Sequence, residues 1–294
     1  MNTRHRSRGD VNTRSGESIA TSGGDLNDRP RGALSVGLLG PLAVSVNELP
    51  VSLTAGRLRA LLAVLALSAG RVVSVDHLAT AVWADENPPG NVRRSVQTYM
   101  ARLRSALGAG SIGSAPAGYV LRADPEHVDA LRFVRLVSTA SETSDAAVKR
   151  MRLAEALDLW RGKPFEGVPS GWLEESEAPW LLERYLTALE WRLDLDISAG
   201  HHGELVVELS ELTARYPLRE SFWARLLIVL DRSGRRADAL ARYETIRARI
   251  AAELGVDPDP TLQRIHADLL ARRTPDPRHP WREPRRDRPS VESG

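Results

Sequence analysis

NVRRSVQTYMARLRSAL, residues 91–107, is the stretch from which the rest of this chain is interpreted. Its apolar residues recur at steps of three and four, the spacing of one face of an α-helix; they are Val92, Val96, Tyr99, Met100, Leu103 and Leu107. The opposite face carries arginine, glutamine and threonine, and the seventeen residues contain no acid. Cations, amides and hydroxyls are the groups that hydrogen-bond phosphates and base edges. The pattern predicts a helix that lies in the major groove of DNA.

A second interpretation of this stretch is a solvated arginine face on an ordinary packed helix, because basic amphipathic helices are common. A surface helix that is kept in solution by charge alone normally mixes both signs along its exposed side. The absence of any acid therefore favours the DNA-binding interpretation. The segments on either side have to decide between the two.

Composition limits the classes of protein to consider. The 294 residues suffice for two domains with cores of their own, and 42% hydrophobic and 27% charged content is ordinary for a globular protein. Because cysteine is absent, disulfides, thiolate chemistry and cysteine-bound zinc are excluded. There is no apolar run of eighteen residues and no signal-peptide core, so we expect no membrane segment and a cytoplasmic, nucleoid-associated protein.

The net charge of +2 hides an uneven distribution along the chain. Residues 34–122 hold eight arginines against four acids, whereas residues 126–273 hold 21 basic residues against 25 acids. A basic unit therefore precedes a mildly acidic one, and an anionic partner is expected for the first unit only. Nearly all strong cations are arginine, which favours bidentate contacts with phosphate and guanine, although a GC-rich genome would give the same bias.

The segment from residue 33 to residue 122 has the pattern of a winged helix. Short alternating runs predict a small antiparallel sheet over 34–53, followed by a helix that Thr54 caps and that ends near Gly70. Ser74 is expected to cap a second helix, Val75–Trp83, and Asn91 or Gly90 to begin the third, DNA-binding helix. Small residues 108–118 then lead into YVLR, a hairpin with Tyr119 and Leu121 facing the core, which is the wing.

Residues 126–272 are predicted to be helical throughout, because segment after segment shows three-and-four spacing between short breaks. Gly234, Ala239 and Tyr243 stand where a tetratricopeptide-like hairpin needs a turn, a small residue and an aromatic ring. The fold class is therefore mainly α with a small β component, an N-terminal winged helix-turn-helix domain before a C-terminal tetratricopeptide-like domain. Residues 1–32 and 273–294 are predicted to be disordered tails, polar in the first case and rich in Pro and Arg in the second.

Two groups of motifs give the chain a family resemblance. LLGPLAV, RLRALLAVLALSAGRVVSVDHLATAVW, VRRSVQTYMARLRSALG and GYVLR resemble the OmpR-type winged helix. ALDLWRGKPFEGV and RYPLRESFWARLLIVLDRSGRRADALARYETIRARIAAELGVDPDPTLQRIH resemble the bacterial transcriptional activator domain. In this order they resemble the Streptomyces antibiotic regulatory protein (SARP) family over residues 34–270. With only a short tail before the winged helix, we expect no phosphoacceptor receiver domain.

The residues expected to contact DNA lie on two helices. Arg93, Arg94, Gln97 and Thr98 occupy the first two turns of the DNA-binding helix, where such a reader approaches base edges. Arg102 and Arg104 follow and are expected to hold phosphates, and Arg57 and Arg59 of the first helix to clamp the flanking backbone. All of them could instead be backbone contacts. The predicted wing contains no arginine, which departs from the usual basic wing tip.

Other conspicuous residues have simpler explanations. Trp160, Trp172, Trp180, Trp191 and Trp223 stand among apolar neighbours at helical spacing and are expected to be core anchors, not base-stacking rings. No motif supplies a nucleophile, a metal site or a phosphate loop, so we expect no enzymatic activity, no cofactor and no metal.

The resemblance implies a sequence-specific transcriptional activator of secondary-metabolite (antibiotic) biosynthesis genes. In that family the target is direct repeats near the −35 region of double-stranded promoter DNA, bound by a homodimer. The partners it implies belong to RNA polymerase holoenzyme and are the sigma factor and the C-terminal domain of the alpha subunit. Two alternatives stay open: a winged-helix repressor that responds to a ligand, and a helical-repeat scaffold for protein interactions.

Overall fold

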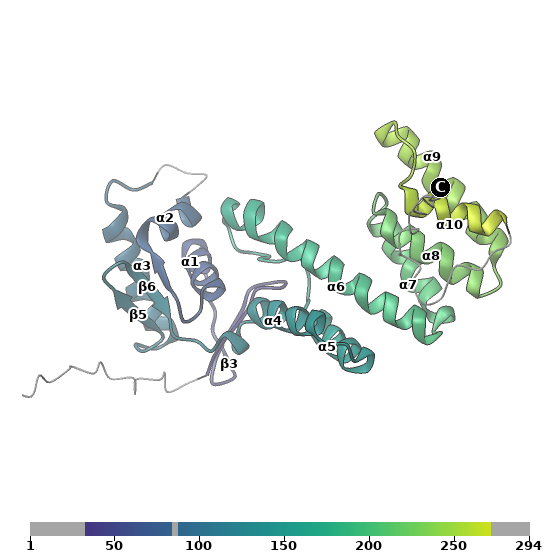
Figure 1. The fold of residues 1–294 in the computed structure, drawn as a ribbon. Helices are drawn as coiled ribbons and strands as arrows, with labels where there is room; N and C mark the ends of the chain where they lie inside the picture. Colours follow the sequence, from purple (N-terminus) through teal and green to yellow (C-terminus); the bar gives the residue numbers. More distant parts are fainter. Residues whose placement is uncertain (1–32, 84–87, 272–294) are drawn as a thin grey trace, which may run out of the picture.

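A computed structural model describes residues 33–83 and 88–271. The predicted tails 1–32 and 273–294 lie outside these residues, as does part of the break between the second and third helices. The described chain has two parts, a compact mixed α/β part and an extended all-helical part (Figure 1), and the first hydrophobic cluster contains residues of both. This confirms the predicted fold class of a winged helix followed by a helical domain.

The first part contains two small antiparallel sheets around three helices. The first sheet has the strand order β1-β2-β3, from Leu34–Gly37, Ala43–Val46 and Leu49–Pro50. The helices are α1 (Gly56–Leu67), α2 (Val75–Trp83) and α3 (Val92–Leu107). The second sheet has the order β4-β6-β5, from Val72–Ser74, Gly118–Leu121 and Ile112–Ala115. The hairpin β5-β6 is the predicted wing; β4, only three residues long, was not predicted.

Helix beginnings follow the predicted caps at two of three places. Asn91 Oδ1 accepts a hydrogen bond from the Arg94 amide at 2.9 Å, and Ser74 Oγ accepts one from the His77 amide at 3.1 Å. Such caps satisfy amide groups that have no partner within the helix. The prediction that Thr54 caps α1 is wrong, because the N-cap position is Ala55, which has no side-chain acceptor.

The second part consists of helices joined by short turns. After the 3₁₀ turn η1 (Pro125–His127) come α4 (Asp129–Glu142) and α5 (Ala146–Asp158), which pack as an antiparallel pair. A π-helical turn, η2 (Leu173–Glu177), leads into the long α6 (Ala178–Ala199). The remaining helices are α7 (His202–Arg215), α8 (Glu220–Arg232), α9 (Arg236–Leu254) and α10 (Pro260–Leu270). Gly234, Ala239 and Tyr243 lie at the turn and on the buried face of the α8-α9 hairpin, as predicted.

The buried side chains form two clusters that divide within α6. The first cluster extends from Leu34 to Ala188 and includes both sheets, α1 to α5 and the beginning of α6. The second extends from Leu186 to Leu269 and includes the rest of α6 and α7 to α10. Figure 1 shows α6 running from the mixed part to the α7–α10 group. The predicted domain boundary at 122–126 remains a prediction, and hydrophobic packing crosses it.

Only one of the five tryptophans predicted to be core anchors is fully buried. Trp223 is 3% exposed, and Trp160, Trp172 and Trp191 are half-buried at the edges of the clusters. The prediction is wrong for Trp180, whose side chain is 46% exposed and lies under the Arg184 guanidinium, 4.5 Å from the ring centroid. An exposed aromatic ring is a favourable partner for a guanidinium. The contact with Arg184 therefore stabilises Trp180 at the surface, outside the core.

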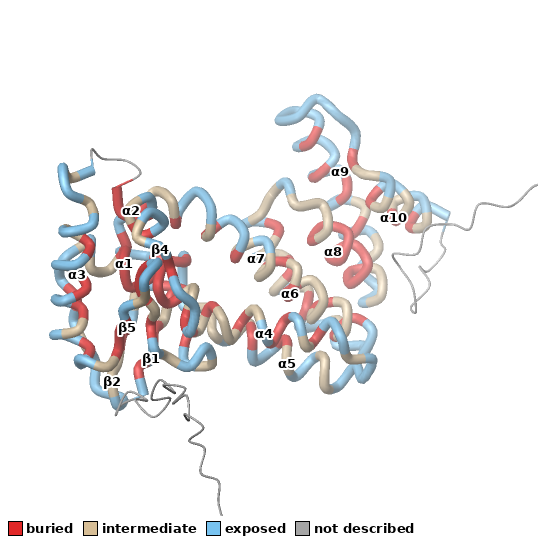
Figure 2. The backbone as a smooth tube through the Cα atoms, turned by 60° about the vertical axis from the view of Figure 1, so that its left-hand side comes forward, coloured by how far each residue is buried: buried red, intermediate tan, exposed pale blue. Residues whose placement is uncertain are grey.

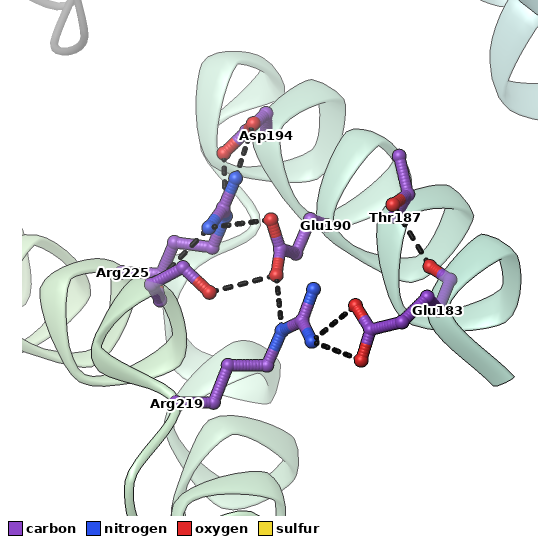
Figure 3. A network of polar contacts seen from close by, with 7 residues as sticks. Glu183, Thr187, Glu190, Asp194, Arg219 and Arg225 are labelled. Atoms are coloured by element: carbon purple, nitrogen blue, oxygen red, sulfur yellow. Dashed lines mark hydrogen bonds and ion pairs between the residues drawn. The ribbon is translucent and has the colours of Figure 1, made fainter. Parts of the chain in front are cut away.

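Ion pairs join α6 to α8 on one side of the second cluster (Figure 3). Arg225, 7% exposed, holds Asp194 through two bonds of 2.8 and 2.7 Å, and Arg219 holds Glu190 and Glu183. Burial acts to lower the pKa of Arg219, but the hydrogen bonds to the two glutamates outweigh it and raise that pKa. The network fixes α8 against α6, the helix that also enters the first cluster.

Candidate nucleic-acid interface

Helix α3 is built as an amphipathic helix with its apolar face in the core. Val96, Met100 and Leu103 are completely buried, and Leu107 is 5% exposed. These residues pack within the first cluster, where α3 contacts α1, α2 and β5. The predicted apolar face is confirmed, and its burial leaves the opposite face in solvent. Figure 2 shows this alternation of buried and exposed residues at the outer edge of the molecule.

The outer face of α3 carries positive charge and is not covered by the helical part. Arg93, Arg94, Gln97, Thr98 and Arg102 are all exposed. The helix contains no acid, and its N-terminal end, where the dipole is positive, is capped by the Asn91 side-chain oxygen. A rigid helix with this face can enter a groove and offer guanidinium and amide groups to phosphates and base edges.

Thr98 differs from its neighbours because its hydroxyl is already engaged. Its Oγ1 donates a hydrogen bond to the carbonyl oxygen of Arg94 at 3.0 Å, the preceding turn of the same helix. The group can therefore offer a ligand its methyl group and its oxygen lone pairs. A thymine methyl or a cytosine amino group matches this chemistry better than a phosphate does.

Arg57 lies next to α3, whereas Arg59 is partly buried. The Arg57 guanidinium donates to the Tyr99 hydroxyl at 3.4 Å and lies 5.9 Å from the Trp83 ring centroid. Gly56, one turn before Arg59, lies against the helical part, because a Cβ placed on it would meet the Pro169 side chain at 2.6 Å and the Arg59 guanidinium at 3.9 Å. The Arg59 Nε is buried without a hydrogen-bond partner among the described residues. The predicted phosphate contact of Arg59 remains a prediction.

Arg104, the last cation of α3, bonds to the wing. It is half-buried, and its guanidinium donates to the Ile112 carbonyl oxygen at 2.9 Å and to Ser114 Oγ at 2.8 Å. Both partners belong to strand β5 of the wing. Arg104 therefore links α3 to the wing in the free protein, and its predicted phosphate contact remains a prediction.

The mixed part is attached to the helical part through a carboxylate that the sequence did not single out. Asp129, the first residue of α4, accepts hydrogen bonds from the amides of Leu38 at 2.6 Å and Leu39 at 3.1 Å. Its side chain is 13% exposed and also pairs with Arg161 at 3.1 Å. Because these amides follow β1 directly, the carboxylate ties the first sheet to the beginning of the helical part.

Backbone hydrogen bonds add to this connection between the first sheet and the helical part, which is called the Asp129 joint below. The Arg161 amide donates to the Leu39 carbonyl at 2.7 Å, and the Phe165 amide donates to the Leu38 carbonyl at 2.8 Å. Gly40 allows the approach, because a Cβ there would lie 2.9 Å from the Arg161 side chain and its φ is +150°. The motifs LLGPLAV and RGKPFEG, both noted in the sequence, therefore pair with each other.

A second contact fastens helix α2 to the segment before α6. Ser170 Oγ, which is buried, donates to the carbonyl oxygen of Ala81 at 2.6 Å. Trp172 meets the His77 ring edge-on, with centroids 4.8 Å apart. Together with the Asp129 joint, this contact holds the α3 face in a fixed orientation relative to the helical part. Neither contact could be found by residue pattern, because each joins residues about ninety positions apart.

Two further observations concern the described ranges 33–83 and 88–271. No group of three or more His, Cys, Asp or Glu side chains there is arranged to hold a metal ion. No helix in these ranges has both the length and the apolar composition that crossing a bilayer requires.

Comparison with family models gives one match for each part of the chain. Residues 48–120 match the family described as transcriptional regulatory protein, C terminal. Residues 128–270 match the bacterial transcriptional activator domain. The first match covers α3 and the wing, and the second covers the helices from α4 to α10.

Individual relatives match over most of the chain. The regulatory protein DnrI of Streptomyces peucetius is 37% identical over 81% of this chain and 93% of its own length. The regulatory protein AfsR of Streptomyces coelicolor is 40% identical over 81% of this chain, but the match spans only 24% of AfsR. The solved structure of Mycobacterium tuberculosis EmbR, in complex with a low-affinity phosphopeptide, has a TM-score of 0.77 and 31% identity. It covers 84% of this chain and 67% of the EmbR chain.

Proposed function

The chain belongs to the Streptomyces antibiotic regulatory protein family of transcriptional regulators, and we propose that it is a sequence-specific activator that binds promoter DNA through α3. The observation that carries this proposal is the exposed, acid-free outer face of α3. In this proposal Arg94 and Gln97 reach base edges in the major groove, where arginine recognises guanine and glutamine recognises adenine. Arg93 and Arg102 hold phosphates, as does Arg57 beside the helix.

The finer features of the proposal come from the family. We propose that the targets are direct repeats near the −35 region of promoters for secondary-metabolite genes, in the nucleoid of the cytoplasm. Repeats spaced by one helical turn, about 10–10.5 bp, would place two protomers on one face of the duplex as a homodimer on DNA. The helical part then contacts the polymerase sigma factor and the C-terminal domain of the polymerase alpha subunit. Activation by recruitment requires no covalent chemistry from this chain.

The fixed joint between the two parts supports recruitment over a ligand-driven repressor. Asp129 and Ser170 hold the helical part against β1 and α2, so a DNA-bound α3 presents the helical part to a neighbouring protein in one orientation. A repressor that releases DNA on ligand binding needs two arrangements of comparable free energy. A joint whose hydrogen bonds are buried or partly buried favours one arrangement.

A footprint tests the proposal. Purified full-length protein is incubated with DNA from the neighbourhood of its own gene, with and without RNA polymerase holoenzyme. We expect protection of two repeats near a −35 element, extended when polymerase is added. With about five phosphates contacted per domain, the logarithm of the binding constant of one domain for one repeat should fall with that of the salt concentration with a slope of about −4.5.

Two variants distinguish DNA recognition by α3 from a general effect of removing positive charge. Arg94→Ala combined with Gln97→Ala should abolish the specific footprint, whereas Arg242→Ala, an exposed arginine on α9, should leave it unchanged. A double variant that protects the same sites would show that α3 is not the reader. In that case the scaffold alternative, with the basic part as a docking surface, becomes the better account.

A further inference from the structure

The side chain of Arg104 extends from the polar side of α3 and contacts the wing. Its Nε donates to the Ile112 carbonyl oxygen and its Nη2 donates to Ser114 Oγ, at 2.9 and 2.8 Å. The guanidinium also lies 5.8 Å from the centroid of the Tyr119 ring. Since Ile112 and Ser114 belong to β5 and Tyr119 to β6, one side chain of the DNA-binding helix holds both strands of the hairpin.

We propose that Arg104 is a positioning residue that fixes the wing against α3, so that the wing meets the DNA backbone or minor groove in register with the helix in the major groove. This inference rests on the proposed DNA-binding function and goes beyond it. It replaces the phosphate contact expected from the sequence with an intramolecular role. A guanidinium suits this role, because its planar fork can donate to two acceptors in one geometry.

The position of β5 in the sheet explains why the wing needs such a contact. In the order β4-β6-β5, strand β5 is an edge, and edge strands carry backbone groups without a partner in the sheet. Arg104 supplies a donor to one of these carbonyls. The opposite side of the hairpin is fixed by close approach of the backbone, because a Cβ on Gly118 would lie 1.9 Å from the Val73 carbonyl oxygen.

Because of its composition, the wing can contact DNA only if it is already held in the right position. Residues 112–121 contain no lysine or arginine, so the hairpin cannot be drawn to phosphates by charge of its own. Its turn, Pro116 and Ala117, is exposed and offers backbone groups and small apolar surface. Such groups bind only where the hairpin is already placed correctly. The wing is held by an α3 cation, Arg104, which bonds to Ile112 and Ser114 of β5.

Hydrogen exchange of the free, full-length protein tests the anchoring without DNA. Arg104→Ala should speed exchange of the amides in β5 and β6 by about tenfold, which corresponds to 1.4 kcal/mol. Arg104→Lys should restore part of the protection, since one ammonium cannot reach both acceptors in the same geometry. Ser114→Ala should give a smaller increase. The control is Arg102→Ala, an exposed arginine two residues away, which should leave wing exchange unchanged.

DNA binding distinguishes a positioning residue from a phosphate contact. Arg104→Ala should weaken binding about tenfold and remove hydroxyl-radical protection at the wing, with the salt slope unchanged. Arg102→Ala should make the salt slope about 0.9 less steep and keep the wing protection. Ser114→Ala removes one anchor without touching the outer face of α3, so it decides the question if Arg104→Ala does not fold.

Two results would overturn the assignment. The first is an Arg104→Ala variant with unchanged wing exchange and a salt slope reduced as in Arg102→Ala, which would make Arg104 a phosphate contact. The second is wild-type wing exchange and wing protection in both Arg104→Ala and Ser114→Ala. If the unaltered protein protects no promoter DNA, the proposed function fails, while the exchange comparison still decides whether Arg104 holds the wing.

Discussion

Replacing Asp129 by alanine should destabilise the joint between the two parts. The carboxylate accepts from two amides, of Leu38 and Leu39, in residues that are completely buried, and it pairs with Arg161. A buried donor that loses its acceptor costs about 1–3 kcal/mol, so the two amides together account for about 2–6 kcal/mol. Arg161 adds little, because its side chain is 40% exposed and keeps its bond to the Pro41 carbonyl at 3.1 Å.

Urea denaturation of the full-length protein, followed by circular dichroism, measures this change. With a loss of about 4 kcal/mol and a slope of about 3 kcal/mol per molar urea, the midpoint should fall by more than about 1 M. Asp129→Asn should lose roughly half as much, because one oxygen still accepts while the amide group cannot pair with the second N–H.

Glu126→Ala is the matched control for this prediction. Glu126 lies three residues before Asp129 and pairs with Arg135, but both side chains are more than 40% exposed. An exposed pair of this kind contributes about 0–1 kcal/mol. If Asp129→Ala shifts the midpoint no more than Glu126→Ala does, the carboxylate does not hold the joint, and the orientation of α3 relative to the helical part must depend on other contacts.

The packing and the charges elsewhere in the chain give three more expected outcomes. Arg225→Ala should lower the free energy of unfolding by about 1.5–3 kcal/mol, because it removes a guanidinium that is 7% exposed together with its two charge-assisted hydrogen bonds to Asp194; a thermal melt that matches the unaltered protein would refute this. Gly118→Ala should move or unfold the wing, since its Cβ would lie 1.9 Å from the Val73 carbonyl oxygen, and unchanged amide chemical shifts in β4 and β6 would contradict it. Burial raises the pKa of Glu220 above its ordinary value. The native state therefore binds the Glu220 proton more tightly than the unfolded chain does. The stability that this tighter proton binding gives is present at low pH and is lost as pH rises through the folded-state pKa. The free energy of unfolding of Glu220→Gln, relative to that of the unaltered protein, should therefore increase between pH 4 and pH 7 in urea titrations. A difference that stays constant over this range would show that burial does not raise the pKa of this carboxyl.

The sequence alone determined the elements whose signals are local. The apolar spacing of Val96, Met100 and Leu103 predicted both the helix α3 and the face that it buries. The caps at Ser74 and Asn91 and the hairpin around Tyr119 were predicted correctly for the same reason, since each depends on residues a few positions apart. The exposure of the arginine-bearing face follows from this pattern, because burial of one side of a helix leaves the other in solvent.

Only the tertiary structure decided which groups the side chains of individual arginines in the predicted site contact. Arg104 and Arg59 have the same residue type and the same helical setting as the exposed cations, but the first is bound by the wing and the second has a buried Nε. The role of Asp129 was likewise invisible, because its partners lie about ninety residues earlier in the chain. Local pattern fixes which face of a helix is buried, whereas the partner of a long polar side chain depends on which distant segment the fold brings within its reach.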